Sequence, residues 1–161
     1  MSLDLEAGIV YLPTHQFSLA YALNEGWKAD GSFKRVPGYQ LGLGIEIERL
    51  SEIVVETPDP PSPFGRLIAF DPLTGTERWG VDHPHFWNGG VLATKGGLVF
   101  QGNSAGNFNA YDSATGEQLW SFSAHRGFLA PPVTYAIDGV QYVAVLAGTG
   151  GAGVPLGDAG P

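Results

Sequence analysis

The sequence predicts an all-β fold, a partial β-propeller of about two to three four-stranded antiparallel blades with a long Pro-rich excursion at about 24–63. The first observation is a repeat: GRLIAFDPLTGTERW (65–79) returns 41 residues later as GNFNAYDSATGEQLW (106–120). A period of that size indicates one supersecondary unit copied along the chain, and about 40 residues make one four-stranded blade. The second is composition, because 24 glycines, 12 prolines and only 15% charged residues indicate a turn-rich β-protein.

The first blade is expected over 1–82, with a long insertion at 24–63. GIVYLP (8–13) is rich in β-branched and aromatic residues, which favours a strand, and a second short strand is expected at about 18–23. The insertion contains TPDPPSP (57–63), which cannot be a central strand because proline lacks an N–H. Within it, 41–55 could hold a short helix or an irregular strand. The blade then continues with strands at 65–71 and 77–82.

A second blade is expected over 83–123, with strands at 91–94, 97–102, 107–112 and 118–123. The last three form one unit whose fourth strand comes from before or after it. Residues 124–153 are expected to give strands of a closing blade, at 131–136 and 141–147. A flexible tail is expected at 154–161.

The repeated residues have structural reasons to recur. Each Asp accepts hydrogen bonds from turn N–H groups, and each Gly supplies the positive φ that closes a hairpin of a type I turn plus bulge. Each Trp lies in the next strand, at a register where a large ring packs between neighbouring sheets. Because turns recur and active sites do not, Asp71 and Asp112 are interpreted as turn residues. The full set is Ala69, Asp71, Thr74, Gly75, Trp79, Ala110, Asp112, Thr115, Gly116 and Trp120.

Charge and composition exclude several kinds of protein. The net charge is −8 and the eight basic residues are not clustered, which argues against a nucleic-acid partner. Without cysteine there is no disulfide, thiolate metal site or covalently attached haem. The first residues, MSLDLEAG, do not resemble a signal peptide, and no apolar run has the roughly 18 residues of a membrane span.

Both repeats resemble the tryptophan-docking motif of pyrroloquinoline quinone (PQQ) dehydrogenases, which are eight-bladed propellers. The segments 2–16, 83–112 and 130–153 are similar to the last blades of the quinohaemoprotein alcohol dehydrogenases. The resemblance implies the C-terminal quarter of such an enzyme, from a periplasmic family that oxidises alcohols by hydride transfer to PQQ with Ca²⁺. The family's cysteine pair, Asp base, Ca²⁺ ligands and haem-binding motif have no counterpart in this chain. We therefore expect no catalytic residue here, and neither PQQ nor Ca²⁺ bound by this chain alone.

The resemblance selects Trp87, Asn88 and Gly89 as cofactor-binding candidates, because the matching loop of the family approaches the PQQ pocket. Asn carries both donor and acceptor groups, and the glycine pair 89–90 allows close backbone approach. The alternative is a tight inter-strand turn with Trp87 packed in a blade interface. The Gly-rich run 148–151 is a weaker candidate. His83 and His85 form an H-x-H pair, but Pro84 indicates a turn and no third metal ligand is near in sequence, so no metal site is predicted.

Two classes of function remain open. In the first, the chain is a fragment of a PQQ-dependent alcohol dehydrogenase and is inactive when isolated. In the second, it is a non-catalytic propeller module that self-associates or binds the missing N-terminal blades, because an open propeller exposes strand edges and a sheet face. A third reading, a cofactor-free scaffold propeller, is disfavoured by the WNGG (87–90) and QYVAVLAG (141–148) segments.

Overall fold

A computed structural model describes residues 1–15, 22–23, 43–44, 65–83, 85 and 87–148. The chain divides into two compact units, Phe17–Pro61 and the combination of Met1–Gln16 with Ser62–Pro161. In the first unit the described residues form one antiparallel pair, β3 (Ala22–Leu23) with β4 (Leu43–Gly44). Apart from these, the predicted strand at 18–23, the excursion at 24–63 with its open choice at 41–55, and the tail at 154–161 lie outside the described residues.

The first four-stranded sheet of the larger unit has the order β1-β2-β5-β6, and every neighbouring pair is antiparallel. Its strands are β1 (Ser2–Asp4), β2 (Ile9–His15), β5 (Gly65–Asp71) and β6 (Thr76–His83). Along β5, buried and partly buried residues alternate, as expected for a strand with one face on a core. β1 was not predicted from the sequence, because three residues are too few to show such an alternation. Asp4 stabilises the turn that follows by accepting from the backbone N–H groups of Glu6 and Ala7.

The second four-stranded sheet is the antiparallel meander β10-β9-β8-β7. Its strands are β7 (Asn88–Thr94), β8 (Leu98–Asn103), β9 (Asn107–Asp112) and β10 (Gln118–Ser123). The fourth strand of this unit thus comes from before it in sequence. The prediction placed the start of β7 three residues too late, at 91. Asn88, Gly89 and Gly90 were interpreted as a loop or turn, but they belong to the strand and contain a bulge, since Asn88 pairs with Asn103 and Val91 with Gln101.

A two-stranded hairpin, β11 (Val133–Ile137) with β12 (Val140–Ala144), follows the second sheet. Asp138 and Gly139 both have positive φ, which is the signature of a two-residue turn that matches the twist of its strands. An isolated bridge joins Phe128 to Gly148 beyond the hairpin. The regular secondary structure of the described residues consists of β-strands without a helix, which confirms the all-β prediction. In that part of the chain, no helix is long and apolar enough to cross a membrane.

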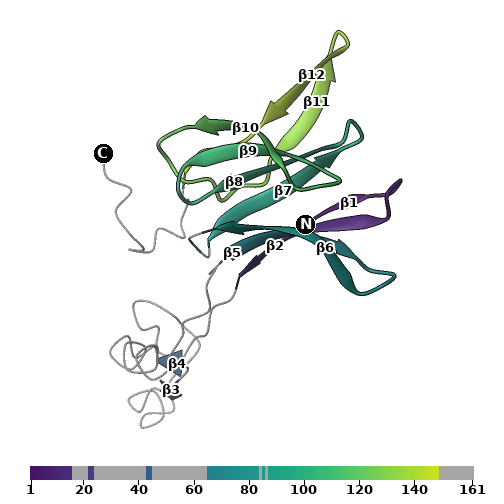
Figure 1. Ribbon diagram of the computed structural model, residues 1–161. Helices are drawn as coiled ribbons and strands as arrows, with labels where there is room; N and C mark the ends of the chain where they lie inside the picture. The colour runs from purple at the N-terminus through teal and green to yellow at the C-terminus, as the bar shows by residue number, and fades with distance from the viewer. Residues whose placement is uncertain (16–21, 24–42, 45–64, 84, 86, 149–161) are drawn as a thin grey trace. The chain divides into compact units, whose positions relative to one another are not determined.

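The core lies where the two four-stranded sheets face each other, and Figure 1 shows β2 of the first sheet beside β7 of the second. Tyr11, Leu67 and Ala69 from the first sheet pack with Val91, Val99 and Tyr111 from the second. Trp79, Val81, Ile9 and Ala93 are partly buried against this cluster. The two sheets are therefore joined by a single apolar interface, and residues near its edges are held by both.

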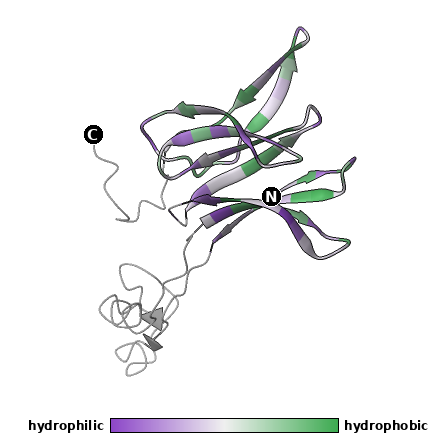
Figure 2. Cartoon of the chain, viewed as in Figure 1, coloured by the Kyte–Doolittle hydropathy of each residue, from purple (hydrophilic) through white to green (hydrophobic). Residues whose placement is uncertain are grey.

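Unlike the core, the edge strand β10 and the hairpin of β11 and β12 are exposed to solvent. Figure 2 shows hydrophobic residues along β11 and β12, and every residue of β10 and β11 is exposed. β10, β11 and β12 contain no charged residue. Their exposed large apolar side chains are Leu119, Trp120, Phe122, Val133, Tyr135, Ile137, Val140 and Tyr142.

Candidate functional site

The two Asp-x-x-Thr-Gly turns are built alike. In the first, Asp71 Oδ1 accepts from the backbone N–H groups of Leu73 and Thr74, at 2.9 and 3.2 Å. In the second, Asp112 Oδ1 accepts from Ala114 and Thr115, both at 2.9 Å. Both carboxylates therefore serve their own turns, and neither is placed as a general base.

The first Asp also has a charged partner. Arg78 Nη2 donates to Asp71 Oδ2 at 2.6 Å, and this hydrogen bond, with help from the turn N–H groups, lowers the pKa of Asp71 to about 2. The pKa of Asp112 is lowered too, mainly by the backbone and side chain of Thr115. Leu119 occupies the position of Arg78 in the second repeat, so that turn has no ion pair there.

Trp79 connects the two sheets. Its Nε1–H donates to the carbonyl of Ser113 at 3.0 Å, and the hydroxyl of Tyr11 donates to the same carbonyl at 3.0 Å. The ring lies over Gly116, where a Cβ atom would come within 2.7 Å of Trp79 Cε3. The second repeat's turn thus has two roles, as a hairpin and as a platform for the tryptophan of the first.

The cofactor-binding candidates lie at the start of β7. Asn88 Nδ2 donates to the carbonyl of His85 at 2.8 Å, while Asn88 Oδ1 is buried and has no hydrogen-bond partner among the described residues. The side-chain amide lies against Gly65, where a Cβ atom would collide with both Asn88 and the His85 carbonyl. Trp87 is 44% exposed. The structure therefore places Trp87 and Asn88 next to each other at the start of β7, where Asn88 brings a buried polar atom against Gly65 of the first sheet.

The glycine pair that follows contacts the chain itself. A Cβ atom on Gly89 would lie 3.0–3.2 Å from the carbonyls of Gly102, Phe128 and Ala130, and one on Gly90 would lie 2.6 Å from Pro131. The close approach that these glycines allow is thus already used by the segment 128–131. The role of Gly89 toward a cofactor stays a prediction.

A buried hydrogen-bond chain supports this strand from the side. Gln101 Nε2 donates to the Gly89 carbonyl at 3.1 Å, and Gln101 Oε1 lies 2.9 Å from His83 Nε2. Because the Gln101 amide nitrogen is used for Gly89, its oxygen is the acceptor and His83 Nε2 carries the proton. Burial lowers the pKa of His83, while Gln101 opposes that shift. Sequence reasoning missed Gln101 altogether, since a single glutamine within a strand carries no recognisable signal.

The remaining candidates do not assemble into a site. His83 is buried and His85 is exposed, so the H-x-H pair does not point to one side. No group of three potential metal ligands occurs among the described side chains. Of the Gly-rich run 148–151, only Gly148 is described, with a φ of 144°.

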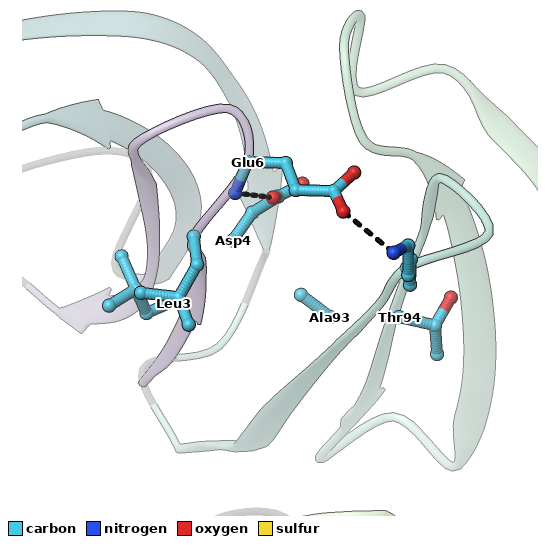
Figure 3. Close-up of a pocket in the computed structure, with 7 residues that line it drawn as sticks. Leu3, Asp4, Glu6, Ala93 and Thr94 are labelled. Atoms are coloured by element: carbon cyan, nitrogen blue, oxygen red, sulfur yellow. Dashed lines mark hydrogen bonds and ion pairs between the residues drawn. The ribbon is translucent and has the colours of Figure 1, made fainter.

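A surface hollow of about 240 Å³ lies elsewhere, between the β1–β2 turn and the end of β7 (Figure 3). Glu6 and Lys95 form an ion pair across it at 2.8 Å. Asp4, which also lines it, is engaged by its own turn. None of the residues selected from the sequence lines this hollow.

Comparison with known proteins decides the family. Residues 83–143 match the model of the β-propeller domain of glucose, ethanol and alcohol dehydrogenases of the PQQ type. The chain is 38% identical over 156 residues to the dehydrogenase subunit of the quinone alcohol dehydrogenase of Gluconacetobacter polyoxogenes. It is 42% identical over 154 residues to the quinohemoprotein alcohol dehydrogenase ADH-IIG of Pseudomonas putida. Each alignment covers 94% of this chain. The chain belongs to the quinoprotein alcohol dehydrogenase family.

Solved structures of the family confirm the partial β-propeller. The quinohemoprotein alcohol dehydrogenase of Comamonas testosteroni superposes with a TM-score of 0.70 and 34% identity, over 91% of this chain and 21% of that one. The Pseudomonas putida enzyme ADHIIG gives a TM-score of 0.69 at 38% identity. The chain spans about a fifth of the length of the relatives it matches.

Proposed function

We propose that this chain forms the C-terminal blades of a PQQ-dependent alcohol dehydrogenase, which as a whole oxidises alcohols by hydride transfer to PQQ. The observation that carries the proposal is 38–42% identity to enzymes of this type along 94% of the chain. In this proposal Trp79 and Trp120 are docking tryptophans of successive blades, and Trp87, Asn88 and Gly89 face the cofactor. The location is periplasmic, as the family resemblance implies.

The described residues do not fit a complete cofactor site. PQQ presents carboxylates and quinone carbonyls, which accept hydrogen bonds and need donors. Asn88 Nδ2 carries two N–H donors and uses one of them on the His85 carbonyl, whereas the buried atom without a partner among the described residues is Oδ1, an acceptor. No cluster of potential metal ligands is found in the described part of the chain to hold Ca²⁺. Asn88 can supply one contact, and the other groups must come from outside these residues.

The isolated chain is therefore expected to be inactive. Purified protein with PQQ, Ca²⁺ and a primary alcohol should reduce no redox dye above the rate without protein. The same chain should restore dye reduction when it is added to a relative from which the matching fifth has been deleted, and Asn88→Ala should weaken that rescue. Dye reduction by the isolated chain would contradict its inactivity, and an absence of rescue by a well-folded chain would contradict the proposed role.

A second candidate function is a non-catalytic module that acts by self-association or by binding other blades. It is favoured by the uncharged surface of β10, β11 and β12, where Trp120, Phe122 and Tyr135 are about half exposed. Apolar patches of this kind mark interaction surfaces in soluble proteins. Light scattering should then show a mass above 17.0 kDa that Trp120→Ala lowers. A strictly monomeric, folded chain would contradict self-association while leaving the first proposal intact.

A further inference from the structure

The start of β7 is irregular, and the irregularity lies beside Asn88. From Asn88 to Val91 the strand advances three residues while β8 advances two, from Asn103 to Gln101. Gly89 and Gly90 thus lie opposite a single residue of β8, Gly102. A bulge interrupts the ladder of backbone hydrogen bonds and turns neighbouring side chains to new directions. The direction of Asn88 therefore depends on what holds the bulge in place.

The side chain of Gln101 holds it. Gly89 is buried, and a buried carbonyl near a bulge needs a hydrogen-bond donor. Gln101 Nε2 supplies one at 3.1 Å from a side chain that is only 1% exposed. Gln101 is held in turn by His83, which is 4% exposed and lies 2.9 Å from Gln101 Oε1. The chain of contacts runs from the end of β6 through β8 to the start of β7.

We propose that His83 is a positioning residue that acts through Gln101 to fix the Gly89 bulge and, with it, the side chain of Asn88. The proposal rests on the proposed function for its purpose, since Asn88 is the cofactor-facing candidate. Its structural content is independent of that function. His83 donates from Nε2, Gln101 accepts and relays through its amide nitrogen, and the Gly89 carbonyl is the final acceptor.

The hydrogen-bond chain from His83 to Gly89 joins the two sheets. It is the last residue of β6 in the first sheet, whereas Gln101 and Gly89 belong to the second. Among the described residues, the charged group that acts on the His83 ring is Asp82. Its side chain is 61% exposed and forms an ion pair with Arg66. The first sheet thus controls the bulge of the second through one neutral hydrogen bond that is sheltered from solvent.

The test is NMR on the ¹⁵N-labelled full chain. In the wild type at neutral pH, the ring nitrogens of His83 should show a neutral imidazole protonated at Nε2. His83→Phe should shift the side-chain amide signal of Asn88 and speed hydrogen exchange at the amides of 89–91 about tenfold. His83→Gln, which keeps a donor, should restore much of the wild-type pattern. His85→Gln is the matched control, because that side chain is exposed and its carbonyl remains.

Gln101→Leu should reproduce the effect of His83→Phe, and the double variant should add nothing further, because both residues act along one path. Additive effects, or an unchanged Asn88 signal in a folded His83→Phe chain, would overturn the proposal. So would an Nδ1-protonated ring in the wild type, a measurement that needs no variant to fold. A failure of the proposed function would give a different result. The Asn88 amide signal would still change in His83→Phe, but Asn88→Ala would leave the rescue of dye reduction unchanged.

Discussion

Trp79 and Trp120 occupy the same position in two copies of one sequence, yet their surroundings differ. Trp79 donates to the Ser113 carbonyl and covers Gly116 in the neighbouring sheet. Trp120 is 49% exposed and contacts aromatic rings of its own sheet, Phe122 at a centroid distance of 6.2 Å and Phe108 at 6.3 Å. Both tryptophans pair with the alanine of their repeat across a bulged ladder. The repeat therefore fixes the position of the ring in its strand, and the neighbouring sheet decides how far the ring is covered.

The turns that contain Gly75 and Gly116 show the same contrast. A Cβ atom on Gly116 would come within 2.7 Å of the Trp79 ring, whereas one on Gly75 would meet nothing within 4 Å. Both glycines have positive φ, 76° and 71°, and both N–H groups close their turn on the Asp carbonyl at 2.9 Å. Residues that look equivalent in sequence thus differ by one inter-sheet contact.

Replacing the tryptophans should give the largest difference. Trp79→Ala removes a ring packed against the core and leaves the buried edge of the interface open, which should cost about 3–5 kcal/mol of unfolding free energy. Trp120→Ala removes a half-exposed ring and should cost about 1 kcal/mol. Urea unfolding followed by circular dichroism measures both. Equal losses would show that the inter-sheet contact of Trp79 adds no stability.

Replacing the glycines should give a smaller difference. Gly75→Ala and Gly116→Ala both place a Cβ in a left-handed conformation, which costs about 1 kcal/mol each. Only the second also pushes a methyl group into the Trp79 ring, so Gly116→Ala should lose about 1–3 kcal/mol more. The double variant Gly116→Ala/Trp79→Ala should lose less than the sum of its parts, because the clash is gone. Additivity in that cycle would contradict the contact.

The repeat predicted the fold well because its signals are local. An Asp that binds turn N–H groups and a Gly with positive φ act within five residues, so the hairpins at 65–83 and 107–123 were readable from the sequence. β1 and the first three residues of β7 were not, because their strand character comes from pairing with β2 and β8. A glycine pair suggests a loop by propensity, and only the neighbouring strand and the segment 128–131 make it a bulged strand.

The candidate site was less predictable for the same reason. Resemblance pointed to Trp87, Asn88 and Gly89, but not to what holds them. Gln101 contacts Gly89 from 12 residues away, Gly65 contacts Asn88 from 23 residues away, and His83 acts on Gln101, which is 18 residues further along the chain. Such contacts follow from how two sheets pack, which a pattern within one strand does not contain.

The two aspartates should give the smallest and most specific difference. Asp71 has Arg78 as its partner and a pKa of about 2, whereas Leu119 stands in the place of that arginine beside Asp112. A carboxyl whose pKa is lower in the folded chain contributes stability above its unfolded pKa of about 3.9, and that contribution is lost as the pH falls toward the folded value. The unfolding midpoint in urea of the wild type should therefore decrease between about pH 4 and pH 2.

Asp71→Asn should flatten that decrease more than Asp112→Asn. Arg78→Leu, which gives the first turn the apolar residue of the second, should make the two turns respond alike; a remaining difference would mean that the ion pair is not what distinguishes them.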